Sequence, residues 1–371
     1  MGGRYVSAMV NSGLEGVVAA ATSLSDVDGE RGELVIAGFP VGELAEHATF
    51  EETTWLLWHG DLPSARQLDE FRAGLAAERT LPPATIALLR ECARAAIDPM
   101  DALRIAAGTI SLISEDARAI VARFPTIVAG FWRLRGGAEP LAPRSDLGHA
   151  ANFLYMLNGE EPDPERVRAL ETYLNTVVDH GLNASTFTAR VITSTGSDLV
   201  SAVVGALGAL KGPLHGGAPG PALDMVFEIG EASRAEAFLR KKIESGEKLM
   251  GFGHRVYKVR DPRADVLAAA AERMFTRAGD MSLYTLARSV EATAIRLLEE
   301  YKPGRRLQTN VEFYTALLLH GLGLEVPLFT PTFAISRVSG WIAHAMEQKR
   351  TNRIIRPRSE YSGPRDRKWR R

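Results

Sequence analysis

Apolar residues recur along most of this chain with the spacing of helices. Leu68, Phe71 and Leu75 lie three or four residues apart, and the same spacing runs from Val167 to Val178. Such a period places the apolar side chains on one helical face. Strict alternation is rare, and the only convincing strand is Glu33–Phe39, between turn residues. The pattern therefore predicts a mainly α fold with a small β-element near the N-terminus.

Helix starts and interruptions can also be read from the pattern. Three pairs have the spacing of a capping box, in which the first side chain caps the helix and the second bonds back to it. These pairs are Thr49 with Glu52, Ser64 with Gln67, and Ser233 with Glu236. Pro125 lies inside the helical pattern from Glu115 to Arg135, where we expect it to kink or divide the helix.

Composition limits the possible classes of protein. The chain has 371 residues, 46% of them hydrophobic, which favours more than one core because single cores rarely grow beyond about 250–300 residues. A net charge of −1 argues against a general nucleic-acid or membrane-surface binder. The one cysteine, Cys92, lies in an apolar run and is expected in the core. With no secretory or membrane-spanning pattern, we expect a soluble cytoplasmic protein.

Two glycine-rich stretches carry histidines. Gly251–Arg263 combines two glycines, His254 and several cations, and Pro262 biases its end towards extended backbone. Its arginines and lysines suit carboxylates or phosphates. A second stretch, Leu210–Ala218, places His215 beside two glycines after an apolar helix. A solvated basic turn is the simpler interpretation of the first stretch alone, but a second histidine on a glycine loop favours a binding site.

Several common sites can be excluded from the spacing. Gly251 and Gly253 are not followed by the third glycine of a dinucleotide fingerprint, and no strand precedes them. The chain has no Walker loop, no nucleophile elbow and no zinc-protease helix motif. His215, His254 and Glu312 lack the short spacings of metal ligands, so no metal is expected.

The segments GPLHGGA, GFGHRVYKVRDPR and NVEFY, in this order, resemble the citrate synthase family. The similarity extends to GLEGV from Gly13, HAANFLYMLNG from His149 and DHGLNASTFTAR from Asp179, and so covers almost the whole chain. The resemblance implies condensation of acetyl-CoA with oxaloacetate, followed by hydrolysis of citryl-CoA to citrate and CoA. Acetyl-CoA is a substrate in this reaction, and no cofactor is expected.

The resemblance also implies roles for individual residues. His215 of GPLHGGA would stabilise the enol of acetyl-CoA, and His254 of GFGHRVY would polarise the ketone of oxaloacetate. Glu312 of NVEFY would remove the methyl proton. Oxaloacetate would be held by four side chains: His180, Arg263, Arg337 and Arg356. CoA would be bound by Gly251, Phe252 and Gly253 of the glycine loop and by Lys258 near a phosphate.

The architecture implied is a two-domain all-helical citrate synthase-like fold. We expect a large helical domain from residues 1–216 and 326–371, and a small helical domain from residues 217–325, with the cleft between them. A homodimer is expected, in which Arg356 reaches the site of the partner. The run Asp198–Leu210 is rich in small residues and could be a core helix or a dimer contact; the resemblance favours the dimer.

The sequence departs from the family pattern at the proposed base. Glu312 stands where the family usually has aspartate, and Thr309 where proline is common. Two alternatives therefore stay open. One is 2-methylcitrate synthase, which uses propionyl-CoA and shares these motifs; the other is a non-catalytic relative that binds CoA or oxaloacetate. A Glu312 side chain turned into an ion pair with Arg305 or Arg306 would favour the second.

Overall fold

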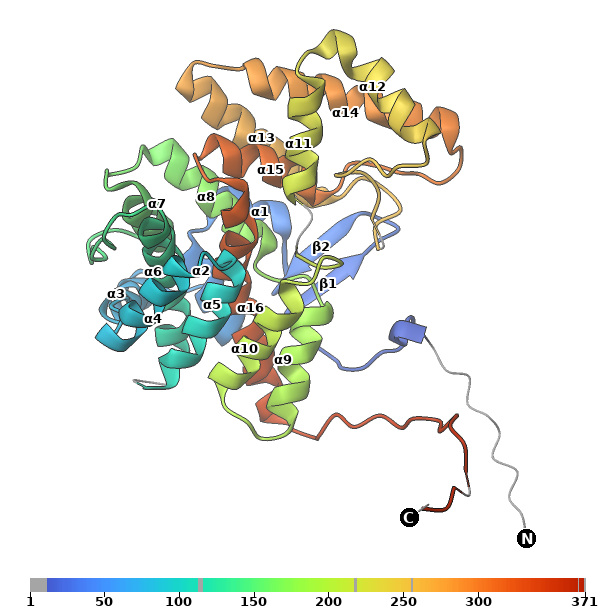
Figure 1. Ribbon diagram of the computed structural model, residues 1–371. Coiled ribbons are helices and arrows are strands. Elements are labelled where there is room, and N and C mark those ends of the chain that lie inside the picture. Colours follow the sequence, from blue (N-terminus) through green and yellow to red (C-terminus); the bar gives the residue numbers. More distant parts are fainter. Residues whose placement is uncertain (1–11, 113–115, 217–218, 255, 366, 370–371) are drawn as a thin grey trace.

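The computed structural model describes residues 12–112, 116–216, 219–254, 256–365 and 367–369. Helices dominate this part of the chain, as the sequence predicts (Figure 1). The α-helices are α1 Val41–His47, α2 Phe50–His59, α3 Ala65–Ala77, α4 Pro83–Arg94, α5 Pro99–Ala107, α6 Ala117–Arg135, α7 His149–Asn158, α8 Pro164–Val177, α9 Ala184–Ser194, α10 Leu199–Leu210, α11 Pro219–Ile229, α12 Ala232–Glu244, α13 Pro262–Ala278, α14 Ser282–Tyr301, α15 Val311–Gly321 and α16 Phe329–Arg350. Short 3-10 turns are η1 Ser12–Leu14, η2 Gly108–Leu112 and η3 Val326–Leu328.

The β-element is a small antiparallel sheet in the order β1–β2–β3. Its strands are β1 Ser25–Asp28, β2 Glu33–Ile36 and β3 Phe39–Pro40. The predicted strand Glu33–Phe39 is thus confirmed but interrupted, because Ala37 and Gly38 turn the backbone at positive φ. The sequence missed β1, whose polar Ser-Asp-Val-Asp sequence is atypical of a strand.

Two of the three predicted capping boxes are present. Thr49 caps α2 with Glu52 bonding back, and Ser64 caps α3 with Gln67. The prediction at Ser233 is wrong, because α12 begins two residues earlier than that box requires. Its N-cap is Glu231, which has extended backbone and no capping bond, and the Ser233 hydroxyl bonds to the Glu231 carboxylate instead.

Pro125 does not divide α6, which continues from Ala117 to Arg135. A proline removes one backbone hydrogen bond and crowds the preceding turn. Every residue of α6 from Ala119 to Phe131 is buried, so packing on both sides offsets that loss. Cys92 is also buried, in α4, as expected of a core residue.

Helix α16 runs through the middle of the molecule (Figure 1). It is buried from Phe329 to Ala345 except at Thr330 and Phe333, and it packs against α2, α6, α8, α9 and α10. A helix that is apolar on all sides is stable only inside a core. The buried stretch nevertheless includes Arg337 and His344, so these polar groups are held inside the protein by the core itself.

Helices α11 to α15 form the upper part of the molecule in Figure 1, with the segment between α12 and α13 descending towards the sheet. The turn after β1 supports that segment. Lys258 donates its backbone N–H to the Gly29 carbonyl at 2.8 Å. A side chain at Gly29 would lie 2.2 Å from the Val256 carbonyl oxygen, so only glycine allows this approach.

In the described part of the chain, no single helix has the length and apolar character needed to cross a membrane. The helix α15 and the segment Val326–Arg350 reach those limits only as a pair, and a bend of 117° separates them.

Candidate active site

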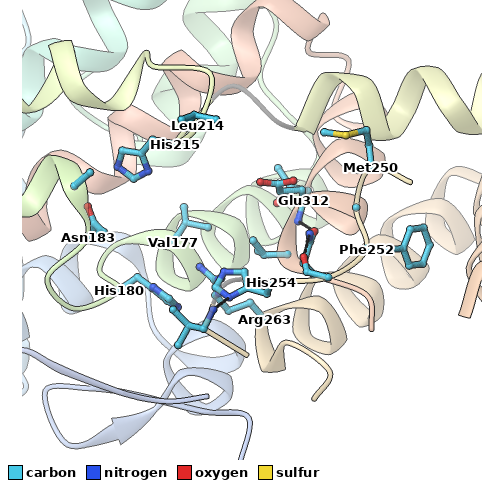
Figure 2. A pocket seen from close by; sticks show the side chains of 18 of the residues that line it. Val177, His180, Asn183, Leu214, His215, Met250, Phe252, His254, Arg263 and Glu312 are labelled. Carbon is cyan, nitrogen blue, oxygen red and sulfur yellow. Dashed lines mark hydrogen bonds between the residues drawn. The ribbon is translucent and has the colours of Figure 1, made fainter. Parts of the chain in front are cut away.

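A cavity of about 1070 Å³ lies between the glycine-rich segment, the start of α15 and the central helix α16. Nine of the eleven site residues predicted from sequence line it. They are His180, His215, Gly251, Phe252, Gly253, His254, Arg263, Glu312 and Arg337. Figure 2 shows His215 and Glu312 on different sides of this space, with His180, His254 and Arg263 grouped below them.

The glycine segment is fixed by pairing with the strand-like residues before α15. Phe252 forms an isolated antiparallel bridge with Thr309. Gly253 donates its N–H to the Gln308 carbonyl at 2.7 Å, and the Gly251 carbonyl accepts from Asn310 at 3.0 Å. Gly251 has φ +84°, and a Cβ there would lie 3.0 Å from Phe313, so glycine is required at this contact.

The same pairing sets the backbone of Glu312. Asn310 caps α15, and its side chain accepts the N–H of Glu312 at 3.0 Å. Its amide nitrogen donates to the Gly253 carbonyl at 2.8 Å. Asp261 contributes from α13, since its carboxylate accepts the Val311 N–H at 3.2 Å. Glu312 therefore sits in the first turn of a helix whose start is tied to both the glycine segment and α13.

Burial raises the pKa of Glu312 to about 7, although Arg263 opposes this shift. A carboxyl group with this pKa can accept a proton near neutrality. Within the described residues, Glu312 makes no ion pair with Arg305 or Arg306. The alternative in which this glutamate is a purely structural ion-pair partner therefore finds no support in the geometry.

The imidazole of His254 has a defined tautomer. Its Nδ1 accepts backbone N–H groups from Val256 at 3.0 Å and Tyr257 at 3.1 Å. A nitrogen that accepts two donors carries no proton, so the proton of the neutral ring is on Nε2. Burial and then the charge of Arg263 lower the pKa of His254 to about 4. His254 is thus a neutral donor at neutral pH.

His215 is held by a network of side chains. Its Nε2 lies 2.8 Å from the Ser185 hydroxyl, which also accepts the indole N–H of Trp341 at 3.0 Å. The Ser185 proton has two acceptors, Asn183 Oδ1 at 2.8 Å and His215 Nε2. When the serine donates to His215, the ring proton must be on Nδ1. Burial and then Arg337 lower the pKa of His215 to about 4, so this ring is also neutral.

Two buried arginines provide positive charge. Arg263 forms a two-pronged bond with Asp261, through Nε at 3.0 Å and Nη2 at 2.8 Å. Arg337 donates Nε to the Val177 carbonyl at 2.7 Å and has no ion pair with a carboxylate among the described residues. Burial lowers the pKa of Arg337 to about 10, so it remains charged. A buried cation without a carboxylate partner is a strong site for an anion.

His180 lies between these cations and the glycine segment. Its Nε2 is 3.1 Å from the Tyr257 hydroxyl, and its ring meets that of His254 edge-on at 5.9 Å. Burial, with Arg263 and Arg337 nearby, lowers its pKa well below the usual value. The three histidines are therefore neutral hydrogen-bonding groups, and the positive charge of the site resides on the arginines.

Two predicted site residues lie outside the lining of this cavity. Lys258 is exposed and does not line the cavity. Arg356 belongs to the tail after α16, which runs away from the body of the chain in Figure 1. The cavity is instead lined by three cations that the sequence analysis missed: Lys248, Lys302 and Arg305. They carry no recognisable motif, and only the fold brings them together.

Metal ligands are not grouped in the described part of the chain. No cluster of three or more histidine, cysteine, aspartate or glutamate side chains there could hold an ion. The chemistry that the geometry supports consists of one carboxylate base, two neutral imidazole donors and cations for an anionic substrate.

Comparison with known proteins shows a consistent pattern. The family model described as "Citrate synthase, C-terminal domain" matches residues 13–358. Citrate synthase 2 of Bacillus subtilis is 44% identical over 364 residues, covering 95% of each chain. The 2-methylcitrate synthase of Mycobacterium tuberculosis is 39% identical over 367 residues, covering 95% of this chain and 91% of its own.

Solved structures agree with these matches over nearly the full length. The citrate synthase of Pyrobaculum aerophilum superposes with a TM-score of 0.88 at 40% identity, covering 97% of this chain and 94% of its own. The Thermoplasma acidophilum enzyme, solved as a ternary complex with carboxymethyl coenzyme A and oxaloacetate, gives 0.87 at 29% identity. That match covers 97% of this chain and 98% of the other.

Proposed function

The chain belongs to the citrate synthase family, and we propose that its central cavity condenses acetyl-CoA with oxaloacetate and hydrolyses the resulting citryl-CoA. The protein is an acyl-transferring enzyme. The observation that carries the proposal is the convergence of Glu312, His215 and His254 on one cavity beside Arg337, which forms no ion pair among the described residues. The side chains and the two substrates supply all the chemistry, with no resident metal or cofactor.

Oxaloacetate has two carboxylates, and fixed cations can hold both in one orientation. Arg337 offers a guanidinium without a carboxylate partner, and Arg263 offers donors beyond those used by Asp261. His180 adds a neutral donor or acceptor beside them. In this arrangement the Nε2–H of His254 points its dipole at the ketone oxygen and stabilises negative charge as the new C–C bond forms.

Acetyl-CoA requires a base and an enol-stabilising donor. Glu312 removes a methyl proton, and the electrons move onto the thioester oxygen. His215, with its proton on Nδ1 and its Nε2 receiving the Ser185 proton, donates to that oxygen. The enol carbon attacks the ketone carbon, the C=O electrons move onto the ketone oxygen, and this alkoxide takes up a proton in place of the one removed by Glu312, giving citryl-CoA. Water then adds to the thioester carbon and the CoA thiolate leaves, taking up a proton.

The CoA phosphates need cations at the other end of the cavity. Gly251 to Gly253 allow the thioester arm to approach the backbone closely. Lys248, Lys302 and Arg305 line the cavity and suit the phosphates. Lys258, which is exposed and does not line the cavity, remains a further candidate from the motif. Loss of CoA affinity in Lys302→Ala but not in Lys258→Ala would separate these two assignments.

We assign residues 1–216 and 326–371 to a large domain and residues 217–325 to a small one, with the cavity between them. Residues 217 and 218, at the first boundary, lie outside the described residues. The cavity lining draws on both parts, since His215 and Arg337 come from the first and Glu312 from the second. Closure of the small domain would exclude water and complete the site.

We also propose a homodimer in which Arg356 completes the site of the partner. Arg356 is exposed and distant from the cavity lining of its own chain, which favours this arrangement. The small residues of α10 are compatible with both a core helix and a dimer contact. Gly205 faces Ile192 of α9 in the same chain, whereas Gly208 is exposed with no atom within 4 Å of its Cβ position.

Subunit exchange tests the role of Arg356. Arg356→Ala and His254→Ala proteins, each inactive alone, are mixed and allowed to exchange. A mixed dimer then contains one site with both residues intact, and activity partly returns. Exchange without recovered activity would mean that Arg356 acts within its own chain or not at all.

The function itself is tested by thiol release with oxaloacetate and either acetyl-CoA or propionyl-CoA. We expect a higher kcat/KM with acetyl-CoA. A higher value with propionyl-CoA would instead identify a 2-methylcitrate synthase; one methylene in an apolar pocket changes specificity by only about 1–3 kcal/mol. No thiol release with either donor, from a folded protein, would leave only a non-catalytic binding role.

A further inference from the structure

Ser25, Asp179 and His344 form a hydrogen-bonded chain next to His180. None of the three takes part in the proposed reaction. The chain of bonds joins α16, the junction between α8 and α9, and the first residue of β1. We propose that Ser25, Asp179 and His344 form a clamp that positions His180 for oxaloacetate. This inference rests on the proposed function, because it assumes that His180 contacts that substrate.

The clamp is centred on Asp179, which is fully buried. The Ser25 hydroxyl donates to Asp179 Oδ2 at 2.5 Å and accepts the Gly181 N–H at 2.8 Å. Ser25 therefore bonds to the residues on both sides of His180. Fixing the two neighbours of a residue restricts its backbone, and hence the direction in which its ring points.

His344 holds the other side of Asp179. Arginine has no acceptor, so the 2.8 Å contact between Arg190 Nη1 and His344 Nδ1 is donated by the arginine. The proton of the neutral His344 ring is therefore on Nε2, which lies 3.2 Å from Asp179 and donates to it. Burial would raise the pKa of Asp179, but His344 and Arg337 lower it below the usual value, so the carboxylate stays ionised.

Close packing leaves this segment little room to move. A Cβ at Gly340 would lie 2.3 Å from the Val178 carbonyl oxygen and 3.1 Å from Asp179 Oδ1. Helix α16 is thus pressed against the backbone that leads into His180. One face of α16 carries residues at helical spacing that each fix part of the site. These are Arg337, Gly340, Trp341 and His344.

The clamp also explains why the small sheet is placed beside the cavity. The segment before β1 is anchored at Ser23, whose N–H donates to Glu347 of α16 at 2.9 Å. Glu347 in turn pairs with Arg190 at 2.7 Å. Ser25 is therefore held at a fixed distance from α16. On this interpretation, Ser25, Asp179 and His344 are positioning residues, since they act through His180.

The test compares Ser25→Ala with Ser23→Ala, measuring oxaloacetate binding by calorimetry without acyl-CoA and turnover by thiol release. Ser25→Ala should raise the oxaloacetate Kd about tenfold. Turnover at saturating oxaloacetate and the KM for acetyl-CoA should change by no more than about twofold. Ser23→Ala is the matched control: it removes the Ser23 hydroxyl bond to Glu347 at 3.2 Å, keeps the backbone N–H bond at 2.9 Å and leaves the Ser25 contacts intact, so its Kd should be unchanged. His344→Gln is the second variant and should also weaken oxaloacetate.

A double-mutant cycle separates positioning from general loosening. If Ser25 acts through His180, the Ser25→Ala effect on Kd should disappear in a His180→Ala background. An equal effect in both backgrounds, or an unchanged Kd in both Ser25→Ala and His344→Gln, would overturn the clamp. Absence of thiol release by the parent protein would contradict the proposed function instead, so the two failures are distinguishable.

Discussion

The two sides of the cavity hold their functional groups by different means. On the helical side, defined by His180, His215 and Arg337, each group is positioned by contacts with α16 or with side chains that α16 fixes. On the loop side, defined by His254, Arg263 and Glu312, the main restraints are backbone hydrogen bonds and the carboxylate of Asp261. The helical side is attached to the core helix α16, and the loop side belongs to the segment we expect to move.

The two arginines show the difference most clearly. Both are almost completely buried. Burial would lower the pKa of Arg263, but its pair with Asp261 raises the pKa above the usual value. Arg337 has no such partner among the described residues, and its pKa falls to about 10. The less compensated charge is therefore that of Arg337 on the helical side, where an anionic substrate can neutralise it further.

The largest expected difference between the two arginines is in how much their replacement changes the free energy of unfolding. Arg263→Met leaves Asp261 buried without its partner, which typically costs about 3–5 kcal/mol. Arg337→Met removes a buried charge that forms no ion pair among the described residues and is stabilised only by the nearby charge of Asp179, so the unliganded protein should be destabilised much less. Urea unfolding without substrate measures both. Both variants should also lose affinity for oxaloacetate. If the two changes lowered the free energy of unfolding equally, the distinction between the arginines would be wrong.

The next largest effect is on turnover. His215→Ala and His254→Ala remove a donor from opposite sides of the cavity, and loss of one donor to developing charge typically lowers kcat about 10²–10³-fold. Circular dichroism should show an intact fold in both. His47→Ala, at an exposed position in α1, is the control and should keep normal turnover. Near-normal kcat in either site variant would remove that histidine from the mechanism.

A smaller effect concerns the stability that the folded protein loses when the buried carboxyl of Glu312 ionises. The pKa of Glu312 is raised from 4.5 to about 7, so the folded state resists its ionisation. Stability from this group is present below pH 4.5 and is lost as the pH rises towards 7. Glu312→Gln avoids that loss, so its melting temperature should exceed the parent's more at pH 8 than at pH 4. If the difference in melting temperature between Glu312→Gln and the parent protein did not change with pH, burial would not raise the pKa of Glu312.

All six residues that define the two sides were expected from sequence and line the cavity, but the contacts that position the helical side were not expected. His254, Arg263 and Glu312 lie in or beside short motifs whose glycines and prolines restrict the backbone locally. By contrast, Ser25 is 154 residues from Asp179 in sequence, and His344 is 165 residues from it. No local pattern marks such pairs, because they meet only when α16 packs into the core. The cations Lys248, Lys302 and Arg305 also line the cavity without belonging to a recognisable motif.

Local rules failed where tertiary packing or a neighbouring residue had the larger effect. Ser233 has the spacing of a cap, but α12 begins at Ala232. Pro125 should disturb a helix, but the buried surroundings of α6 keep it continuous. The mainly helical class, by contrast, follows from apolar spacing repeated along the whole chain, and a few wrong boundaries do not change it.

The central claim is that Glu312, although it stands where the family usually has aspartate, is the base that removes the methyl proton. The most direct test is exchange of the acetyl-CoA methyl hydrogens with deuterated solvent, followed by NMR in the presence of an oxaloacetate analogue that cannot condense. The parent protein should exchange them. Glu312→Gln keeps the size of the side chain but cannot accept the proton, and it should abolish exchange while still binding the analogue. Undiminished exchange in Glu312→Gln would show that another residue is the base.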